Sequence, residues 1–107
     1  MASAYINAKV DLTGTGATVL YTAPSITTAI ITSILVSEDS GSSDTITVTL
    51  TNAAAAVFSL FKVKAVSANT TVELLTRPLV VGEGEIIKVT AATGGRLHVV
   101  ASLLELS

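Results

Sequence analysis

The residues in this chain that could do acid, base or nucleophilic chemistry are few and widely spaced. The one histidine, His98, lies in the segment Arg96-Leu-His-Val-Val, where strand alternation turns it away from Leu97 and Val99. A Ser-His-Asp triad needs a histidine that is oriented by a carboxylate and adjacent to a serine. The sequence shows no such grouping and no Gly-x-Ser-x-Gly elbow. We therefore interpret His98 as a strand residue that faces outward or into an interface.

Two acidic segments could bind a cation or act as a carboxylate pair. The segment Glu38-Asp-Ser-Gly-Ser-Ser-Asp44 has enough oxygen ligands for calcium but lacks the later bidentate glutamate of an EF-hand loop. Glu83 and Glu85 flank Gly84, whereas the two carboxylates of a glycosidase face each other across a cleft. Glycine, serine and aspartate are ordinary turn residues. Both segments are therefore interpreted as solvated hairpin loops, and we predict no catalytic residue, no metal, no cofactor and no enzymatic activity.

The composition argues against several other classes of function. Charged residues make up 13% of the 107 residues, against about 25% in typical globular proteins. The net charge is −2 and the six basic residues are scattered, which disfavours nucleic-acid binding. No apolar run approaches the roughly 20 residues of a membrane-spanning helix, so no membrane partner is expected. The chain has no cysteine, which removes disulfides and thiolate metal sites.

The elements that position these residues are predicted to be strands. Ile46, Val48 and Leu50 alternate with threonines, which is the period of a half-buried strand. Turn residues separate such segments too closely for helical crossovers, so the strands pair antiparallel. The fold class is all-β: one domain over residues 1–107, a two-sheet, jelly-roll-like sandwich of about eight strands. The expected strands are Ala4–Leu12, Ala17–Thr22, Thr28–Ser37, Asp44–Asn52, Val57–Val66, Thr71–Val80, Glu85–Ala92 and Arg96–Leu106.

Some of these strands are apolar on both faces, although a two-layer sandwich buries only one face of each sheet. In the segment 28–37, regular alternation puts Ile30, Ile34 and Val36 on one face and Ala29, Ile31 and Leu35 on the other. The segment 57–66 and the C-terminal strand share this feature. The surplus apolar side chains must lie beneath loops or against another chain. The low charge favours a chain packed against neighbours, and an unusual soluble sandwich is the alternative.

We predict that the surplus residues form contacts between copies of the chain. Cyclic closure uses up complementary patches and leaves none exposed, and a homotrimer is the preferred form. Each large apolar side chain that leaves water contributes roughly 1.5–3 kcal/mol, which offsets part of the entropy lost on association. The predicted interface residues are Tyr5, Ile6, Phe58, Leu60, Leu104 and Leu106.

The order of several short segments resembles small β-sandwich proteins from the virions of tailed bacteriophages. The matching segments are Thr18-Val-Leu-Tyr-Thr-Ala-Pro24, Ala29-Ile-Ile-Thr-Ser-Ile-Leu-Val36, Thr45-Ile-Thr-Val-Thr-Leu50, Leu79-Val-Val-Gly-Glu-Gly-Glu-Ile-Ile87 and Val99-Val-Ala-Ser-Leu-Leu-Glu105. Similar proteins often have Leu-Tyr-Thr-Val-Pro with a following turn glycine, and Leu-x-x-Gly-Asp before the penultimate strand. Here Ser25 replaces the glycine and Glu83 the aspartate. None of these residues is catalytic, so the resemblance transfers no site.

The resemblance implies a structural protein of the virion, made in the cytoplasm of the host bacterium. It fits a capsid decoration (cement) protein that binds the major capsid protein, which we favour, and a tail or fibre component is the alternative. A carbohydrate-binding sandwich is an alternative from another class. Sugar faces stack on exposed aromatic rings, however, and the chain has no tryptophan and only Tyr5 and Tyr21. A small hydrolase is disfavoured by the residues described above.

Overall fold

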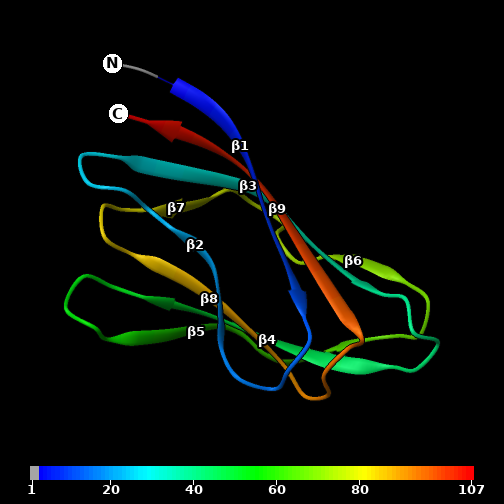
Figure 1. Cartoon of the computed structure of the whole chain (residues 1–107). Helices are drawn as coiled ribbons and strands as arrows, with labels where there is room; N and C mark the ends of the chain where they lie inside the picture. Colours follow the sequence, from blue (N-terminus) through cyan, green and yellow to red (C-terminus); the bar gives the residue numbers. More distant parts are fainter. Residues whose placement is uncertain (1–2) are drawn as a thin grey trace.

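The computed structural model describes residues 3–107, and all of its regular structure is β-strand. Two antiparallel sheets pack against each other (Figure 1), which confirms the predicted all-β sandwich. Within residues 3–107 no helix is long and apolar enough to cross a membrane. The strands are β1 (Ser3–Leu12), β2 (Thr18–Thr22), β3 (Thr28–Glu38), β4 (Asp44–Thr51), β5 (Val57–Val66), β6 (Thr71–Glu73), β7 (Leu79–Val81), β8 (Ile86–Ala91) and β9 (Leu97–Leu106).

The strand order is that of a jelly roll once β6 and β7 are counted as one interrupted strand. The first sheet has the order β1-β9-β3, with β6 and β7 both paired to the remaining edge of β3. The second sheet has the order β2-β8-β4-β5. The prediction of one continuous strand over Thr71–Val80 is therefore wrong. Pro78 has no N–H to donate to a ladder, and the chain leaves the sheet edge between Glu73 and Leu79.

The core lies between the two sheets and follows from alternation along each strand. In β4, Ile46 and Val48 are fully buried, and the threonines between them are on the other face. In β9, the four alternate residues Leu97, Val99, Ala101 and Leu103 are buried and belong to the same core cluster as the buried residues of β4 and β8. The predicted half-buried strands are confirmed at these two elements.

The apparent second apolar face of β3 has a different origin from the one predicted. Regular alternation puts Ile31 and Ile34 on opposite faces, yet both are fully buried. The register with β9 shifts between Ile31 and Ser33, so Thr32 is an extra residue in a β-bulge. The Thr32 hydroxyl donates to the Ser102 carbonyl oxygen at 3.1 Å. The bulge therefore places most of the apolar residues of β3 on the one face that packs in the core.

The β8–β9 loop approaches the β1–β2 loop so closely at Gly94 that a side chain has no room. A methyl group there would overlap the Thr13 carbonyl oxygen and lie 3.2 Å from the Gly14 Cα. Gly94→Ala is expected to lower the free energy of unfolding by about 1–3 kcal/mol, the usual cost of overpacking. Urea denaturation of the wild type and the variant measures the change in the free energy of unfolding.

Gly16 supplies a matched control for this substitution. No heavy atom lies within 4 Å of a methyl group built there, so Gly16→Ala should change the stability by less than about 0.5 kcal/mol. Equal urea midpoints for the two variants would contradict the close approach of these loops.

Candidate functional site

The outer face of the first sheet has an apolar row across four strands. Residues paired across antiparallel strands point to the same face. The register pairs Tyr5 of β1 with Leu104 of β9, Leu104 with Ile30 of β3, and Ile30 with Val80 of β7. Tyr5 is 88% exposed and Val80 is 59% exposed, while Leu104 and Ile30 are half-buried.

The row lies at one end of an elongated molecule, whose longest dimension is 44 Å. This end holds both described chain ends and the loops that follow β2, β4 and β7 (Figure 1). Eight large hydrophobic side chains are exposed in residues 3–107, and five of them are here. We call it the apolar end; its exposed large side chains are Tyr5, Ile26, Val57, Phe58 and Val80.

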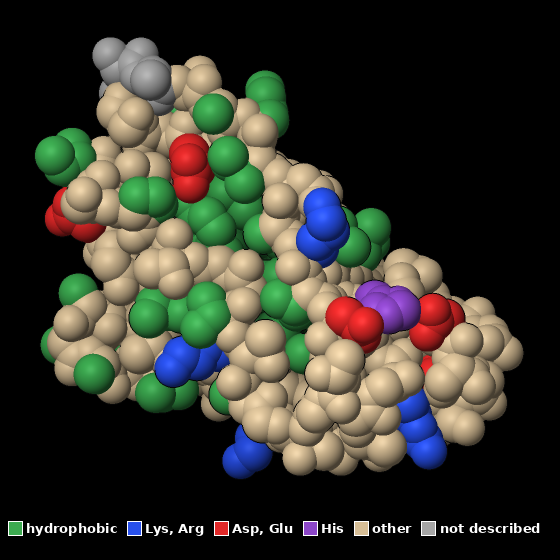
Figure 2. All heavy atoms as spheres, in the orientation of Figure 1, with side chains coloured by type: hydrophobic (Ala, Val, Ile, Leu, Met, Phe, Trp, Pro, Cys, Tyr) green, Lys and Arg blue, Asp and Glu red, His purple; other side chains and the backbone are tan. Residues whose placement is uncertain are grey.

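The opposite end, which we call the polar end, holds the loops at 13–17, 39–43, 67–70 and 92–96. Its loops are rich in glycine, serine and threonine and contain no exposed large hydrophobic side chain among the described residues. In the view of Figure 2, hydrophobic side chains gather toward the apolar end, and the histidine lies between two acidic side chains toward the other. The sandwich is thus amphipathic along its long axis.

The structure separates the six predicted interface residues into two groups. Tyr5, Leu104 and Leu106 share the outer face of the first sheet, and Phe58 lies at the same end on the second sheet, 53% exposed. Ile6 and Leu60 instead pack against the core, where they are half-buried. The sequence analysis missed Ile30 and Val80, because only the cross-strand register shows that they extend the Tyr5 row.

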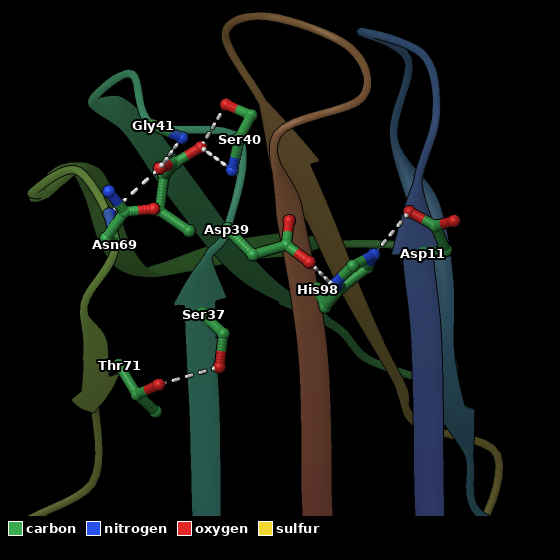
Figure 3. A network of polar contacts seen from close by, with 9 residues as sticks. Asp11, Ser37, Asp39, Ser40, Gly41, Asn69, Thr71 and His98 are labelled. Carbon is green, nitrogen blue, oxygen red and sulfur yellow. Dashed lines mark hydrogen bonds and ion pairs between the residues drawn. The ribbon is translucent and has the colours of Figure 1, made fainter.

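His98 lies between two aspartates on the outer face of the first sheet (Figure 3). Its Nε2 is 3.2 Å from an Asp11 carboxylate oxygen and its Nδ1 is 3.3 Å from an Asp39 carboxylate oxygen. Both ring nitrogens donate only when the ring carries two protons. The predicted outward orientation of His98 is confirmed, since Leu97 and Val99 are fully buried.

Neither aspartate could be assigned to His98 from the sequence. Asp11 reaches it through the β1–β9 register, and Asp39 is the first residue after β3. The nearest serine in the same row, Ser37, pairs its hydroxyl with that of Thr71 at 2.9 Å. The His98 ring therefore lies between two carboxylates on the outer face of the sheet, without the serine partner of a triad.

Glu38, which the sequence analysis placed in a solvated hairpin loop, is a buried residue with 2% exposure, and the loop after it joins β3 of the first sheet to β4 of the second, so that prediction is wrong. The Glu38 carboxylate accepts hydrogen bonds from the Ser40 hydroxyl and from the backbone N–H groups of Ser40 (2.9 Å), Gly41 (3.1 Å) and Asn69 (3.0 Å). Burial alone would raise the pKa of Glu38, but these hydrogen bonds outweigh it and lower the pKa from 4.5 to about 2. Glu38 thus joins the β3–β4 and β5–β6 loops at the polar end.

Other carboxylates are also bound within the chain. Asp44 is buried and accepts from the N–H groups of Thr45 (2.8 Å) and Thr93 (3.1 Å). Glu85 accepts from the Gly82 N–H at 2.7 Å within the loop that carries the chain from β7 in the first sheet to β8 in the second, so the predicted hairpin at Glu83 and Glu85 is wrong. In residues 3–107 no three histidine, cysteine or acidic side chains are grouped so that they could hold a metal ion.

Tyr21 and Glu105 link the two sheets near the apolar end. The buried Tyr21 hydroxyl donates to the Glu105 carboxylate at 2.5 Å. Burial raises the pKa of Tyr21, and the hydrogen bond and the negative charge of Glu105 raise it further. One oxygen of Glu105 is therefore used within the chain, where it holds β9 of the first sheet to β2 of the second.

A groove of about 300 Å³ opens on one side of the sandwich, between the edges of the two sheets. Leu60 and Phe61 of β5 form one wall, and residues 74–79, between β6 and the start of β7, form the other. Its lining is mostly apolar, and Arg77 is its one charged residue. On the other side of the sandwich, the consecutive strands β1 and β2 are in contact and join the two sheets.

Comparison with known proteins gives a fold and no family. No family model and no curated protein sequence matches the chain. Among solved structures, a protein of Bacillus endospore appendages, described as a family of disulfide-linked pili, superposes with a TM-score of 0.54 at 8% identity, over 99% of this chain and 85% of that one. A chain from a structure of infectious bursal disease virus, Gt strain, superposes with a TM-score of 0.46 at 8% identity. The superposition covers 98% of this chain and 30% of that one.

Proposed function

We propose that this protein is a non-enzymatic structural subunit of a bacteriophage virion, which acts by contact as a capsid decoration protein. Its partners are copies of itself, as a homotrimer, and the major capsid protein, and its location is the virion surface. The observation that carries the proposal is the apolar end. Apolar residues from both sheets are exposed there, and monomeric proteins rarely leave contiguous apolar patches of more than a few hundred Å² uncovered.

Several carboxylates are hydrogen-bonded within the chain, which supports a structural role through protein–protein contacts rather than a catalytic one. Glu38, Asp44, Glu85 and Glu105 are all hydrogen-bonded within the chain. The resemblance of the sequence to virion proteins points in the same direction. The carbohydrate-binding alternative is weakened because Tyr21 is buried, and the exposed aromatic rings among residues 3–107, those of Tyr5 and Phe58, are on different sheets.

A tail or fibre component is the second candidate, and the amphipathic long axis favours it. A subunit with different surfaces at its two ends and edges suits repeated head-to-tail contacts, which give filaments when they do not close into a ring. The spore-appendage protein shows that a sandwich of this fold occurs in pili. Those pili are described as disulfide-linked, whereas this chain has no cysteine, so its contacts would be noncovalent.

The test introduces a negative charge at the apolar end by substitution. Phe58→Asp and Leu104→Asp should each weaken self-association and binding to shells of the major capsid protein from the same genome. Each removes roughly 1.5–3 kcal/mol of apolar burial, or about tenfold or more in affinity. Light scattering measures the mass, and co-sedimentation with the shells measures the binding.

Val19→Asp is the matched control, because Val19 is 48% exposed but lies outside the apolar end. It should keep the wild-type mass and shell binding. A monodisperse wild-type monomer, with both apolar-end variants binding the shells normally, would overturn the proposed function.

A further inference from the structure

Tyr5 is the most exposed large hydrophobic residue among residues 3–107, and it is held firmly in place. It is on β1, which forms one edge of the first sheet and pairs with β9 along its full length. Its neighbour Ile6 packs inward against the core. The ring is therefore presented by a regular strand rather than by a loose chain end, so little conformational entropy is lost when something covers it.

The groove is at the opposite edge of the same sheet. Its wall at 74–79 follows β6 and leads into β7, the strands at the far edge from β1. Leu60, Phe61 and Leu75 expose part of their apolar surface while the rest packs on the core. An aromatic ring with a polar tip suits such a site, and a guanidinium such as that of Arg77 is attracted to the face of a tyrosine ring.

We propose that Tyr5 of one copy of the chain inserts into the groove between β5 and residues 74–79 of a second copy. This rests on the proposed function as a self-assembling subunit and names the contact. Because Tyr5 and the groove are on opposite edges, each copy offers both a donor and an acceptor. The contact is heterologous and repeats from copy to copy, in a ring if the rotation closes and in a filament if it does not.

The apolar ring and the size of the surface, rather than charge, support this pairing. The groove side carries the exposed cations Lys62, Lys64 and Arg77. On the same face of β1 as Tyr5, Lys9 and Asp11 carry opposite charges, and Asp11 is paired with His98. A side of the molecule that measures 44 Å by at least 22 Å has room for the roughly 800 Å² per partner of a standard interface.

Simple strand addition at β5 is a poorer alternative. Its register with β4 shifts twice, and Val63 has a φ of 52°. Bulges and lysines on an edge strand disfavour a regular ladder with another chain. Side chains that enter the groove, rather than backbone hydrogen bonds, therefore carry the contact.

The experiment uses two variants that damage opposite partners of the contact. Tyr5→Asp removes the ring but leaves the groove, and Thr76→Arg blocks the groove but leaves the ring; Thr76 is exposed, so folding is spared. Each variant alone should be a monomer at concentrations at which the wild type is an oligomer. Mixed in equal amounts they should form a dimer that grows no further, because one intact contact remains per pair.

Tyr5→Phe is the control for Tyr5→Asp, because it keeps an aromatic ring. Thr15→Arg is the control for Thr76→Arg, because it places the new charge in the distant β1–β2 loop. Both controls should keep the wild-type mass. Circular dichroism verifies folding of each variant. A wild-type monomer at all concentrations, variants with wild-type mass, or a mixture that stays monomeric would overturn the proposed contact. The shell-binding assay with Phe58→Asp and Leu104→Asp tests the proposed function separately, so that function stands if only this contact fails.

Discussion

Ile34→Ala is expected to lower the free energy of unfolding by about 2–5 kcal/mol, which is the usual range for truncating a buried isoleucine. Ile34 is fully buried, and its carbonyl oxygen and N–H also hold the Leu74 N–H and the Glu73 carboxylate in place. A domain of this size has a total stability of roughly 5–15 kcal/mol, so the variant loses a large part of it. Urea denaturation at neutral pH measures the change.

Leu35→Ala is the matched control one residue away. Leu35 is 38% exposed on the outer face of the first sheet, so its truncation should cost no more than about 1 kcal/mol. The comparison tests the bulge at Thr32 directly. Similar losses for the two variants, or a larger loss for Leu35→Ala, would show that β3 has a different phase from the one described.

Glu38→Gln is expected to destabilise the protein at neutral pH and to remove part of its acid sensitivity. The amide keeps one acceptor oxygen but puts an NH2 group among donors from Ser40, Gly41 and Asn69. The pKa of Glu38 is about 2 in the folded protein, below its usual value of 4.5. The ionised form therefore stabilises the fold above pH 4.5, and this contribution is lost as the pH falls toward 2.

The measurement is the urea midpoint of the wild type and of Glu38→Gln at several values between pH 7 and pH 2. The gap between the two proteins should be widest above pH 4.5 and should narrow toward pH 2. Asp39→Asn is the control, because Asp39 is the next residue but is largely exposed and pairs with His98. A gap that does not change with pH would contradict the role assigned to the Glu38 carboxylate.

The sequence alone determined the all-β class, the two-sheet sandwich and most strand positions. The reason is physical: alternation in segments such as 45–51 and turn residues between strands are local properties. They also placed His98 on the opposite face from Leu97 and Val99, since alternation needs no knowledge of the neighbouring strand. The low charge and the apolar surplus near the chain ends are local properties as well, and they predict Tyr5, Leu104 and Leu106 as interface residues.

Only the tertiary structure decided which of the apolar residues beyond a single strand face are buried in the core and which remain exposed. The bulge at Thr32 depends on how β3 pairs with β9, so Ile31 and Ile34 could not be placed on one face beforehand. The partners of His98 and Glu38 come from separate strands and loops, and the Tyr5 row is joined by register across four strands. Antiparallel pairing brings residues as far apart in sequence as Tyr5 and Leu104 into contact. Such pairing joins segments that are far apart in the sequence, so it cannot be seen in any one of them alone.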